Sequence, residues 1–167
     1  MKLLLLRHAI AEDQEEFSRT GKDDRLRPLT PEGRKKMKQG AKGLRDILPD
    51  IDLLATSPLT RAAQTGAIVD SVYGGLAEVE IEELSPEATP TDFLRWLRKQ
   101  KAGCIAAVGH EPSISLILSW LLTGSERRIF AFRKGGACLL DFPDEVGAGT
   151  ATLVWALTPA QLRELAD

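Results

Sequence analysis

The sequence predicts an α/β fold, a single three-layer α/β/α domain with a mostly parallel central sheet and helices on both faces. Short apolar runs at 3–6, 51–55 and 105–108 alternate with segments of helical periodicity. Apolar runs of this length are typical of strands buried on both faces, and strands that alternate with helices favour a parallel sheet. Because no linker, internal repeat or low-complexity segment interrupts this order, we expect residues 1–167 to form one domain.

Composition and charge describe an ordinary globular protein. The chain is 43% hydrophobic and 28% charged, and its net charge of −2 favours neither nucleic acid nor an anionic membrane as a partner. The apolar run at 3–6 is shorter than the roughly 7–15 residues of a secretory signal. The apolar stretch at 114–122 covers about half of a membrane span. We therefore expect a cytoplasmic protein, while the oligomeric state stays open.

The first half of the chain is expected to begin with a strand at 3–6. Residues 9–28 are highly charged and lack periodicity, which indicates a solvated loop or, for segment 11–28, a lid over a site. Thr30 and Pro31 then open a helix as its N-cap and first residue. Apolar residues at helical spacing form the inner face of this helix: Met37, Ala41, Leu44 and Leu48. A strand at 51–55 follows, and residues 56–61 then turn into a second helix that runs to about Val69.

The second half continues the alternation and then changes. We expect an edge strand at 79–81, a helix after Thr89 and Pro90, a central strand at 105–108 and an apolar helix at 113–122. Two further strands, at 137–141 and 152–157, are joined by a glycine-containing loop, and Thr158 and Pro159 open a closing helix. Strands that alternate with helices predict a mostly parallel sheet. After Gly124 the pattern changes, because two strands follow each other without a helix between them.

The two cysteines are interpreted as small buried side chains. Cys104 and Cys138 each adjoin or lie in an apolar strand-like run, where a free cysteine behaves as a hydrophobic residue. No Cys-x-x-Cys pair and no His-x-x-x-His helix is present, so we expect neither a metal site nor another cofactor.

The two histidines of the chain, His8 and His110, each follow a predicted buried strand. In open α/β sheets, ligands bind beyond the carboxyl ends of the strands. Arg7 precedes the first histidine, and Arg61 follows the strand at 51–55. If these strands are neighbours, two imidazoles and two guanidinium groups converge on one crevice. Guanidinium groups match phosphate oxygens in a two-pronged geometry, so the sequence predicts a phosphate-binding site.

Phosphoryl transfer through a histidine is the chemistry that suits such a crevice. A neutral imidazole is a good nucleophile near neutral pH, and phosphoryl transfer asks the protein mainly for positioning and charge stabilisation. We expect Arg7, Arg61 and a protonated His110 to hold the phosphoryl oxygens while His8 attacks. The competing interpretation is that both histidines are structural residues at strand ends.

Three motifs then carry a family resemblance: Leu5-Leu6-Arg7-His8-Ala9, Thr56-Ser57-Pro58-Leu59-Thr60-Arg61-Ala62-Ala63-Gln64-Thr65 and Val108-Gly109-His110-Glu111-Pro112. In order and across most of the chain they resemble the histidine phosphatase superfamily, also called phosphoglycerate mutase-like. Within the superfamily, the chain resembles the SixA-like phosphohistidine phosphatase branch. It shares with this branch the short length, the Arg-His-Ala form of the first motif and the run Arg27-Pro28-Leu29-Thr30. Ala9 departs from the glycine that is usual in the superfamily, which matters only if φ is positive there.

The resemblance implies roles for individual residues. His8 is expected to become a phosphohistidine, while Arg7, Arg61 and His110 bind the phosphoryl group. Arg27 matches a basic position that reaches the same pocket. Glu83 is the nearest match to the acidic proton donor of many family members, and a plain solvated acid is the alternative at that position. A phosphoramidate leaves readily once its nitrogen is protonated, so a strong general acid matters less for phosphohistidine than for an alkyl phosphate.

Three functions stay open at this point. The first is a metal-independent phosphatase that acts on phosphohistidine in a protein, which fits a chain without an insertion long enough to cap the pocket. The second is a small-molecule phosphomonoesterase. The third is a phosphate- or phosphoprotein-binding module without turnover, for which the basic helix face at 34–45 offers a docking surface.

Overall fold

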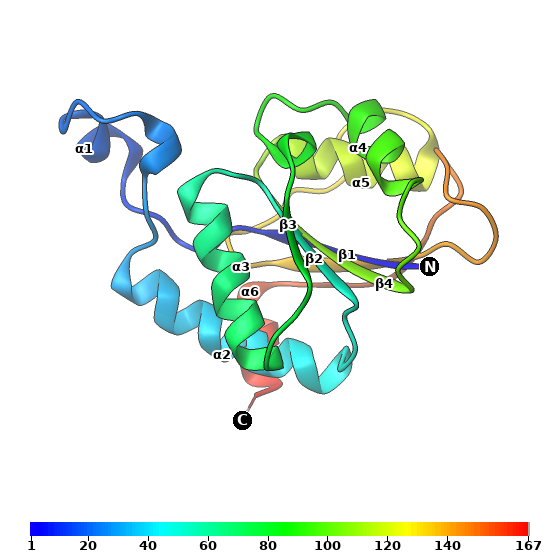
Figure 1. The fold of residues 1–167 in the computed structure, drawn as a ribbon, viewed down its shortest axis with the longest axis horizontal. Helices are drawn as coiled ribbons and strands as arrows, with labels where there is room; N and C mark the ends of the chain where they lie inside the picture. Colours follow the sequence, from blue (N-terminus) through cyan, green and yellow to red (C-terminus); the bar gives the residue numbers. More distant parts are fainter. Residues whose placement is uncertain (167) are drawn as a thin grey trace.

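The computed structural model describes residues 1–166 and contains one six-stranded sheet in the order β3-β2-β4-β1-β5-β6 (Figure 1). The strands are β1 (Lys2–Arg7), β2 (Leu53–Thr56), β3 (Glu78–Glu80), β4 (Cys104–Gly109), β5 (Ala137–Asp141) and β6 (Thr152–Leu157). β3, β2, β4 and β1 are parallel, whereas β5 runs antiparallel to β1 and β6 antiparallel to β5. The expected α/β fold with a mostly parallel sheet is confirmed.

The centre of the sheet is formed by β1 and β4, the two most apolar strands. They pair in parallel from Lys2 with Cys104 to Arg7 with Gly109. Every residue of β4 is buried, and the leucines at 3–6 are 0% exposed. Strands covered on both faces need apolar residues at successive positions, which explains why these runs do not alternate with polar residues.

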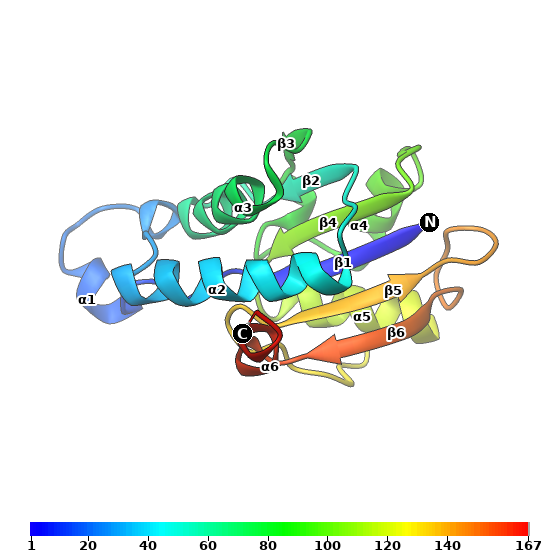
Figure 2. The same cartoon turned by 90° about the horizontal axis from the view of Figure 1, so that it is seen from below.

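Helices cover both faces of the sheet, as the two views in Figures 1 and 2 show. α2 (Pro31–Ile47), α3 (Thr60–Tyr73) and α6 (Pro159–Glu164) pack against the face that carries Leu4 and Leu6. α4 (Pro90–Leu97) and α5 (Ser113–Thr123) pack against the face that carries Leu3 and Leu5. Successive strand residues point to opposite faces, so one leucine run supplies both cores. No helix within residues 1–166 has the length and apolarity needed to cross a bilayer.

Helix starts follow the predicted caps. Thr30, Thr89 and Thr158 each accept a hydrogen bond from a backbone N–H of the first turn, and a proline follows each of them in the first helical positions. The side-chain oxygen satisfies a donor that has no partner inside the helix, and proline loses no bond there. Sequence and structure therefore agree closely on where α2, α4 and α6 begin.

Segment 11–28 differs from the expected irregular loop. It contains the short helix α1 (Gln14–Ser18) and the 3₁₀ turn η1 (Asp24–Leu26), whose N-caps Asp13 and Asp23 accept backbone hydrogen bonds. Phe17 is buried, and a bridge between Ala11 and Leu29 closes the base of the segment. Figure 1 shows the segment extending beyond the end of the sheet where β1 finishes. Elements of three to five residues are too short to produce a periodic sequence pattern.

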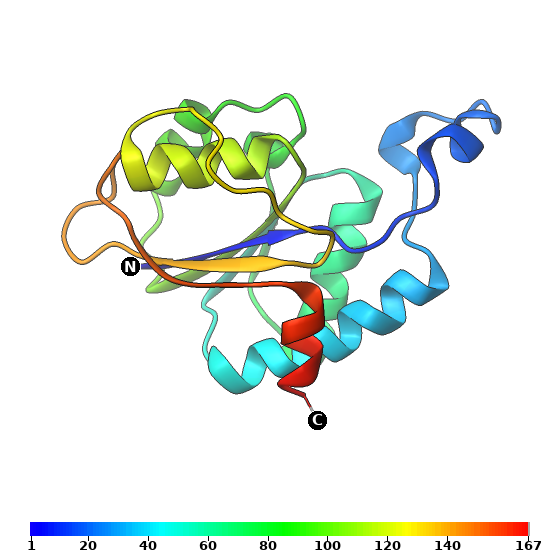
Figure 3. The same ribbon diagram turned by 180° about the vertical axis from the view of Figure 1, so that it is seen from behind.

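The end of the chain forms an antiparallel pair that returns beside β1. Viewed from behind in Figure 3, β5 and β6 run side by side, and the chain then turns into α6. α6 packs on α2, where Gly43 faces the backbone carbonyl of Leu162 so closely that a Cβ atom would collide with it. Gly33 makes a similar close approach to the carbonyl of Ile10. Glycine is required at both positions by lack of space rather than by backbone angle.

Candidate active site

The carboxyl ends of β1, β2 and β4 meet at one edge of the sheet, because these strands are parallel neighbours. His8 follows β1, His110 follows β4, and Arg61 lies in the first turn of α3, after β2. A cavity of about 700 Å³ opens at this edge and is called the His8 pocket below. Arg7, His8, Arg27, Arg61 and His110 all line it. The structure therefore brings together five of the six residues that the sequence singled out.

His8 is held in one orientation and one tautomer. The residue is 5% exposed, and Nδ1 of its ring lies 2.7 Å from the carbonyl oxygen of Ala9. A carbonyl only accepts hydrogen bonds, so Nδ1 carries the proton and the lone pair lies on Nε2. Burial lowers the pKa of His8 to about 3, and the charges of Arg61 and Arg7 act in the same direction. The ring is thus neutral at neutral pH, with a free lone pair on Nε2.

Ala9 fits at its position because its backbone is not left-handed. Within residues 1–166, only glycines have a positive φ. The Ala9 N–H donates to Oγ1 of Thr65 at 3.0 Å, and that hydroxyl donates to the carbonyl of Arg61 at 2.7 Å. Thr65 therefore ties the segment after β1 to the first turns of α3. This contact explains why the last residue of the 56–65 motif is a threonine.

His110 faces His8, with ring centroids 5.1 Å apart. Its Nε2 is 2.8 Å from Oγ of Ser57, and its buried Nδ1 has no partner within the described chain. Burial, together with the charges of His8, Arg61 and Arg7, lowers the pKa of His110 to about 2. A buried site that already holds arginines disfavours another positive charge, so the ring of His110 is neutral without a bound anion. A protonated His110 on a bound phosphoryl group stays a prediction.

Two arginines flank the imidazoles and leave donors free. Nη1 of Arg7 donates to the carbonyl of Phe132 at 2.6 Å, and Nη1 of Arg61 donates to the carbonyl of Asp24 at 3.0 Å. The Nε atoms of both arginines are buried and have no partner among residues 1–166. Together with Nδ1 of His110, three buried nitrogens on residues that line the pocket lack a partner within residues 1–166. Buried donors without partners are costly, so the arrangement fits a bound anion.

Asp24 is a residue of this pocket that the sequence analysis did not identify. Its carboxylate is 2.8 Å from Nε of Arg27 and 3.4 Å from Nη2 of Arg61. The hydrogen bond from Arg27 is the largest of several effects that hold the pKa of Asp24 below its usual range. Arg27 also donates to the carbonyl of Glu12 at 2.9 Å. An acid in a charged loop has no distinctive local pattern, so only the folded segment reveals this contact.

Glu111, the acid of the third motif, fastens the loop that positions Arg7. Its Oε1 accepts from the backbone N–H of Phe132 at 3.0 Å and also from Ser115, while Oε2 pairs with Arg128 at 3.1 Å. The carbonyl of Phe132 in turn accepts from Arg7. Glu111 is therefore linked to the guanidinium of Arg7 through the backbone of one residue, Phe132.

Glu83 is not brought to the His8 pocket. It lines a separate depression beside α4, together with Glu82, Asp92 and Trp96 among others. The carboxylates that line the His8 pocket are instead Glu12, Asp13, Asp23, Asp24, Glu87 and Glu111. The short turn at Glu82–Leu84 directs Leu84 into the core and leaves Glu83 on the α4 side. The position of Glu83 in the sequence therefore did not predict which cavity its side chain lines.

The cysteines lie in the core as expected. Cys104 and Cys138 are free and buried, and burial raises their thiol pKa values to about 11 and about 12. Neither lines the His8 pocket. In the part of the chain that the structure describes, no three His, Cys, Asp or Glu side chains are grouped as a metal site.

A family model described as histidine phosphatase superfamily (branch 1) matches residues 3–87, which is half of the chain and includes His8 and Arg61. The chain belongs to the histidine phosphatase superfamily. An uncharacterized protein of Picosynechococcus sp. is 32% identical over 139 residues, covering 81% of this chain and 82% of that protein. Phosphohistidine phosphatase SixA of Escherichia coli is 24% identical over 98% of this chain and 97% of its own.

Solved structures show the same fold over nearly the whole chain. The protein histidine phosphatase SixA complexed with tungstate has a TM-score of 0.82 and 22% identity, with 97% of this chain and 99% of that chain covered. The alpha-ribazole phosphatase of Shigella flexneri has a TM-score of 0.74 and 19% identity, with 95% and 97% covered. The superfamily and the SixA-like fold predicted from the motifs are therefore confirmed.

Proposed function

We propose that this protein is a metal-independent phosphatase that works through a phosphohistidine intermediate on His8, with phosphohistidine in a protein as its substrate. The observation that carries the proposal is the Nδ1–H bond of His8 to the carbonyl of Ala9. This bond leaves a lone pair on Nε2, in a pocket with three partnerless nitrogens that suit phosphoryl oxygens.

The reaction has two steps. In the first, Nε2 of His8 attacks phosphorus, the bond from phosphorus to the substrate nitrogen breaks, and that nitrogen leaves with a proton. In the second, the oxygen of a water molecule attacks phosphorus, the bond to His8 breaks, and inorganic phosphate and a proton are released. Arg7 and Arg61 compensate the charge of the phosphoryl oxygens in both steps. Burial keeps the ring of His8 neutral before each cycle.

The choice of phosphohistidine rests on the relatives and on the shape of the chain. Two of the proteins that it resembles carry that substrate in their names. Segment 11–28 borders the pocket on one side, where Asp24 and Arg27 form an ion pair. A protein substrate can therefore approach from the remaining sides.

The test is covalent labelling. Incubation with a labelled phosphohistidine protein, followed by an alkaline quench, should give an acid-labile label on the wild type and none on His8→Ala. Equal label on both proteins would exclude His8 as the nucleophile. Absence of label and of phosphate release in the wild type would instead support the non-catalytic binding module.

A second candidate function, a small-molecule phosphomonoesterase, is favoured by one observation. Glu87 lines the His8 pocket, so an acid borders the phosphoryl site. Burial lowers the pKa of Arg61, and the charge of Glu87 is one of the smaller effects that oppose this shift. Alkyl phosphates need such an acid to protonate the leaving oxygen. Glu87→Gln should then slow hydrolysis of sugar phosphates far more than that of phosphohistidine, and Glu83→Gln should slow neither. A loss confined to Glu83→Gln would restore Glu83 as the donor.

A further inference from the structure

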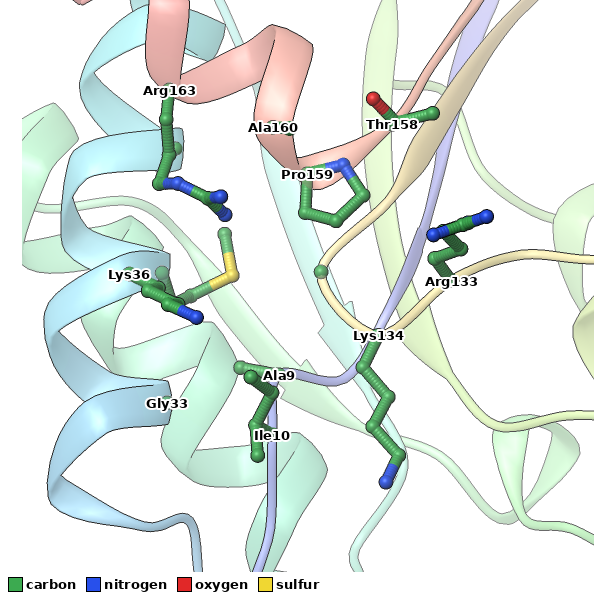
Figure 4. Close-up of a pocket in the computed structure, with 13 residues that line it drawn as sticks. Ala9, Ile10, Gly33, Lys36, Arg133, Lys134, Thr158, Pro159, Ala160 and Arg163 are labelled. Carbon is green, nitrogen blue, oxygen red and sulfur yellow. The ribbon is translucent and has the colours of Figure 1, made fainter.

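A second cavity of about 450 Å³ lies behind the segment that follows β1, between α2, α6 and residues 133–135. We call it the α2–α6 pocket (Figure 4). Its floor is apolar and includes Ile10, Met37 and Pro159. The close approaches of Gly33 to Ile10 and of Gly43 to Leu162 hold α2 against its neighbours on either side of this opening. The pocket is therefore a fixed hollow of the fold, with a size typical of ligand sites.

Four basic side chains line the pocket, and no acidic residue does: Lys36, Arg133, Lys134 and Arg163. Lys36 pairs with Glu32 at 2.8 Å. The other three form no salt bridge with a carboxylate of residues 1–166. In Figure 4, Arg163 extends from α6 toward the part of α2 that carries Lys36. Uncompensated like charges around one hollow create a positive potential that attracts anions.

The pocket is joined to the candidate active site by residues that serve both. Lys134 lines the two cavities, and Ala9, whose carbonyl orients His8, lines the second one. The N–H of Gly135 lies 3.1 Å from the carbonyl oxygens of both Arg7 and His8. A chain bound at His8 can therefore continue over the segment at 9–10 into the second cavity.

The two sides of the His8 pocket differ in charge. On the side of segment 11–28 it is bordered by four carboxylates and two guanidinium groups, a net negative set: Glu12, Asp13, Asp23, Asp24, Arg25 and Arg27. An acidic peptide is repelled there and attracted toward the α2–α6 pocket, whose basic character continues on the outer face of α2 at 34–42. We propose that the α2–α6 pocket binds an acidic, partly apolar segment of the protein that carries the phosphohistidine. This inference rests on the proposed phosphoprotein substrate and names the feature by which it is selected.

The experiment compares two synthetic phosphohistidine peptides. In one of them Glu-Leu-Glu flanks the phosphorylated residue, and in the other Gln-Leu-Gln does. The wild type should prefer the acidic peptide by about tenfold in kcat/KM, mainly through KM, which is the effect of roughly two partly screened ion pairs. Arg163→Glu should remove this preference. Lys101→Glu, an equal change of charge at an exposed position outside both pockets, should keep it. Turnover of para-nitrophenyl phosphate should be the same in all three proteins.

Binding of the unphosphorylated peptides, followed by fluorescence anisotropy, separates the two proposals. If no phosphohistidine peptide is hydrolysed, the proposed function fails. The anisotropy measurement then still shows whether the α2–α6 pocket binds an acidic peptide. Acidic peptide bound by the wild type and by Lys101→Glu but not by Arg163→Glu supports the assignment. Equal binding of both peptides, or binding of inorganic pyrophosphate alone, overturns it. If Arg163→Glu does not fold, Arg163→Met replaces it in the test. This variant keeps the aliphatic contacts of the side chain and should also lose the preference.

Discussion

At the scale of single residues, Asp24 occupies the position where an anion is expected. Its carboxylate lies between the guanidinium groups of Arg27 and Arg61, and its negative charge offsets part of their positive charge. Charge-assisted hydrogen bonds of this kind are the strongest that side chains make. An incoming phosphoryl group must compete with this carboxylate for Arg61.

Asp24→Asn should therefore strengthen the binding of tungstate or inorganic phosphate by about tenfold, since a neutral amide competes less and does not repel the ligand. Isothermal titration calorimetry measures the change. Asp23→Asn removes a charge from the same rim without touching Arg61 and should leave the affinity nearly unchanged. Weaker binding by Asp24→Asn would mean that the carboxylate serves to orient the arginines.

Arg61→Lys should lower kcat/KM by about 10²-fold, the usual cost of removing one donor to developing charge. An ammonium group is a single point charge, whereas the free Nε and the terminal nitrogens of Arg61 can contact different phosphoryl oxygens. Steady-state kinetics with a phosphohistidine peptide tests this, and unchanged rates would remove Arg61 from the reaction.

The histidine tautomers are also open to direct measurement. Because the chain has only two histidines, imidazole ¹⁵N spectra contain two sets of signals. Both rings should stay neutral down to about pH 5, far below the usual value near 6.5, with His8 as the Nδ1–H form. Tungstate should move the signals of His110 toward those of the protonated ring. A titration of either free ring near its usual pKa would contradict the proposed geometry.

At the scale of elements, the packing of α6 on α2 depends on glycines that the sequence pattern marks only as helix interior. Gly43 lies against the carbonyl of Leu162, whereas Gly40 has only an ordinary 3.8 Å contact with Cβ of the same leucine. The two glycines lie on one helix and differ in the space available for a side chain.

Gly43→Ala should lower the free energy of unfolding by about 1–3 kcal/mol, the typical cost of overpacking. Gly40→Ala should raise it by roughly 0.5–1 kcal/mol, because alanine is the better helix former and meets no obstacle. Urea unfolding of both variants provides the comparison. Equal effects would show that α6 moves to accommodate the extra methyl group.

At the scale of the whole molecule, two buried neutral histidines link stability to pH. Their pKa values in the folded protein, about 3 and about 2, lie below the value near 6.5 of the unfolded chain. Between these values the unfolded chain binds more protons than the folded one. The stabilisation of the folded state that depends on these two neutral histidines is therefore fully present above about pH 6.5, and it is lost progressively as the pH falls.

The free energy of unfolding should fall below this point by about 1.4 kcal/mol per pH unit for each histidine. Urea unfolding between about pH 7.5 and about pH 5 measures the slope. His110→Asn should reduce the slope by roughly half, because one of the two groups is removed. A slope that does not change would assign the acid sensitivity to other groups, such as the paired carboxylate of Asp24.

Much of this molecule follows from the sequence alone. The apolar runs fixed the positions of β1, β2 and β4, since strands buried on both faces leave no other pattern. The threonine–proline pairs marked where α2, α4 and α6 begin. The histidines and arginines at strand ends predicted an anion site, because parallel strands expose their carboxyl ends on one edge.

Only the tertiary structure decided the remaining features. The strand order made β1 and β2 the two neighbours of β4, and the folded segment 11–28 placed Asp24 between two arginines. The turn after β3 directed Glu83 away from the pocket, and the packing of α6 on α2 created a second, basic cavity. These features are contacts between residues far apart in the chain. They depend on how strands pair and helices pack, which a local pattern of residues does not encode.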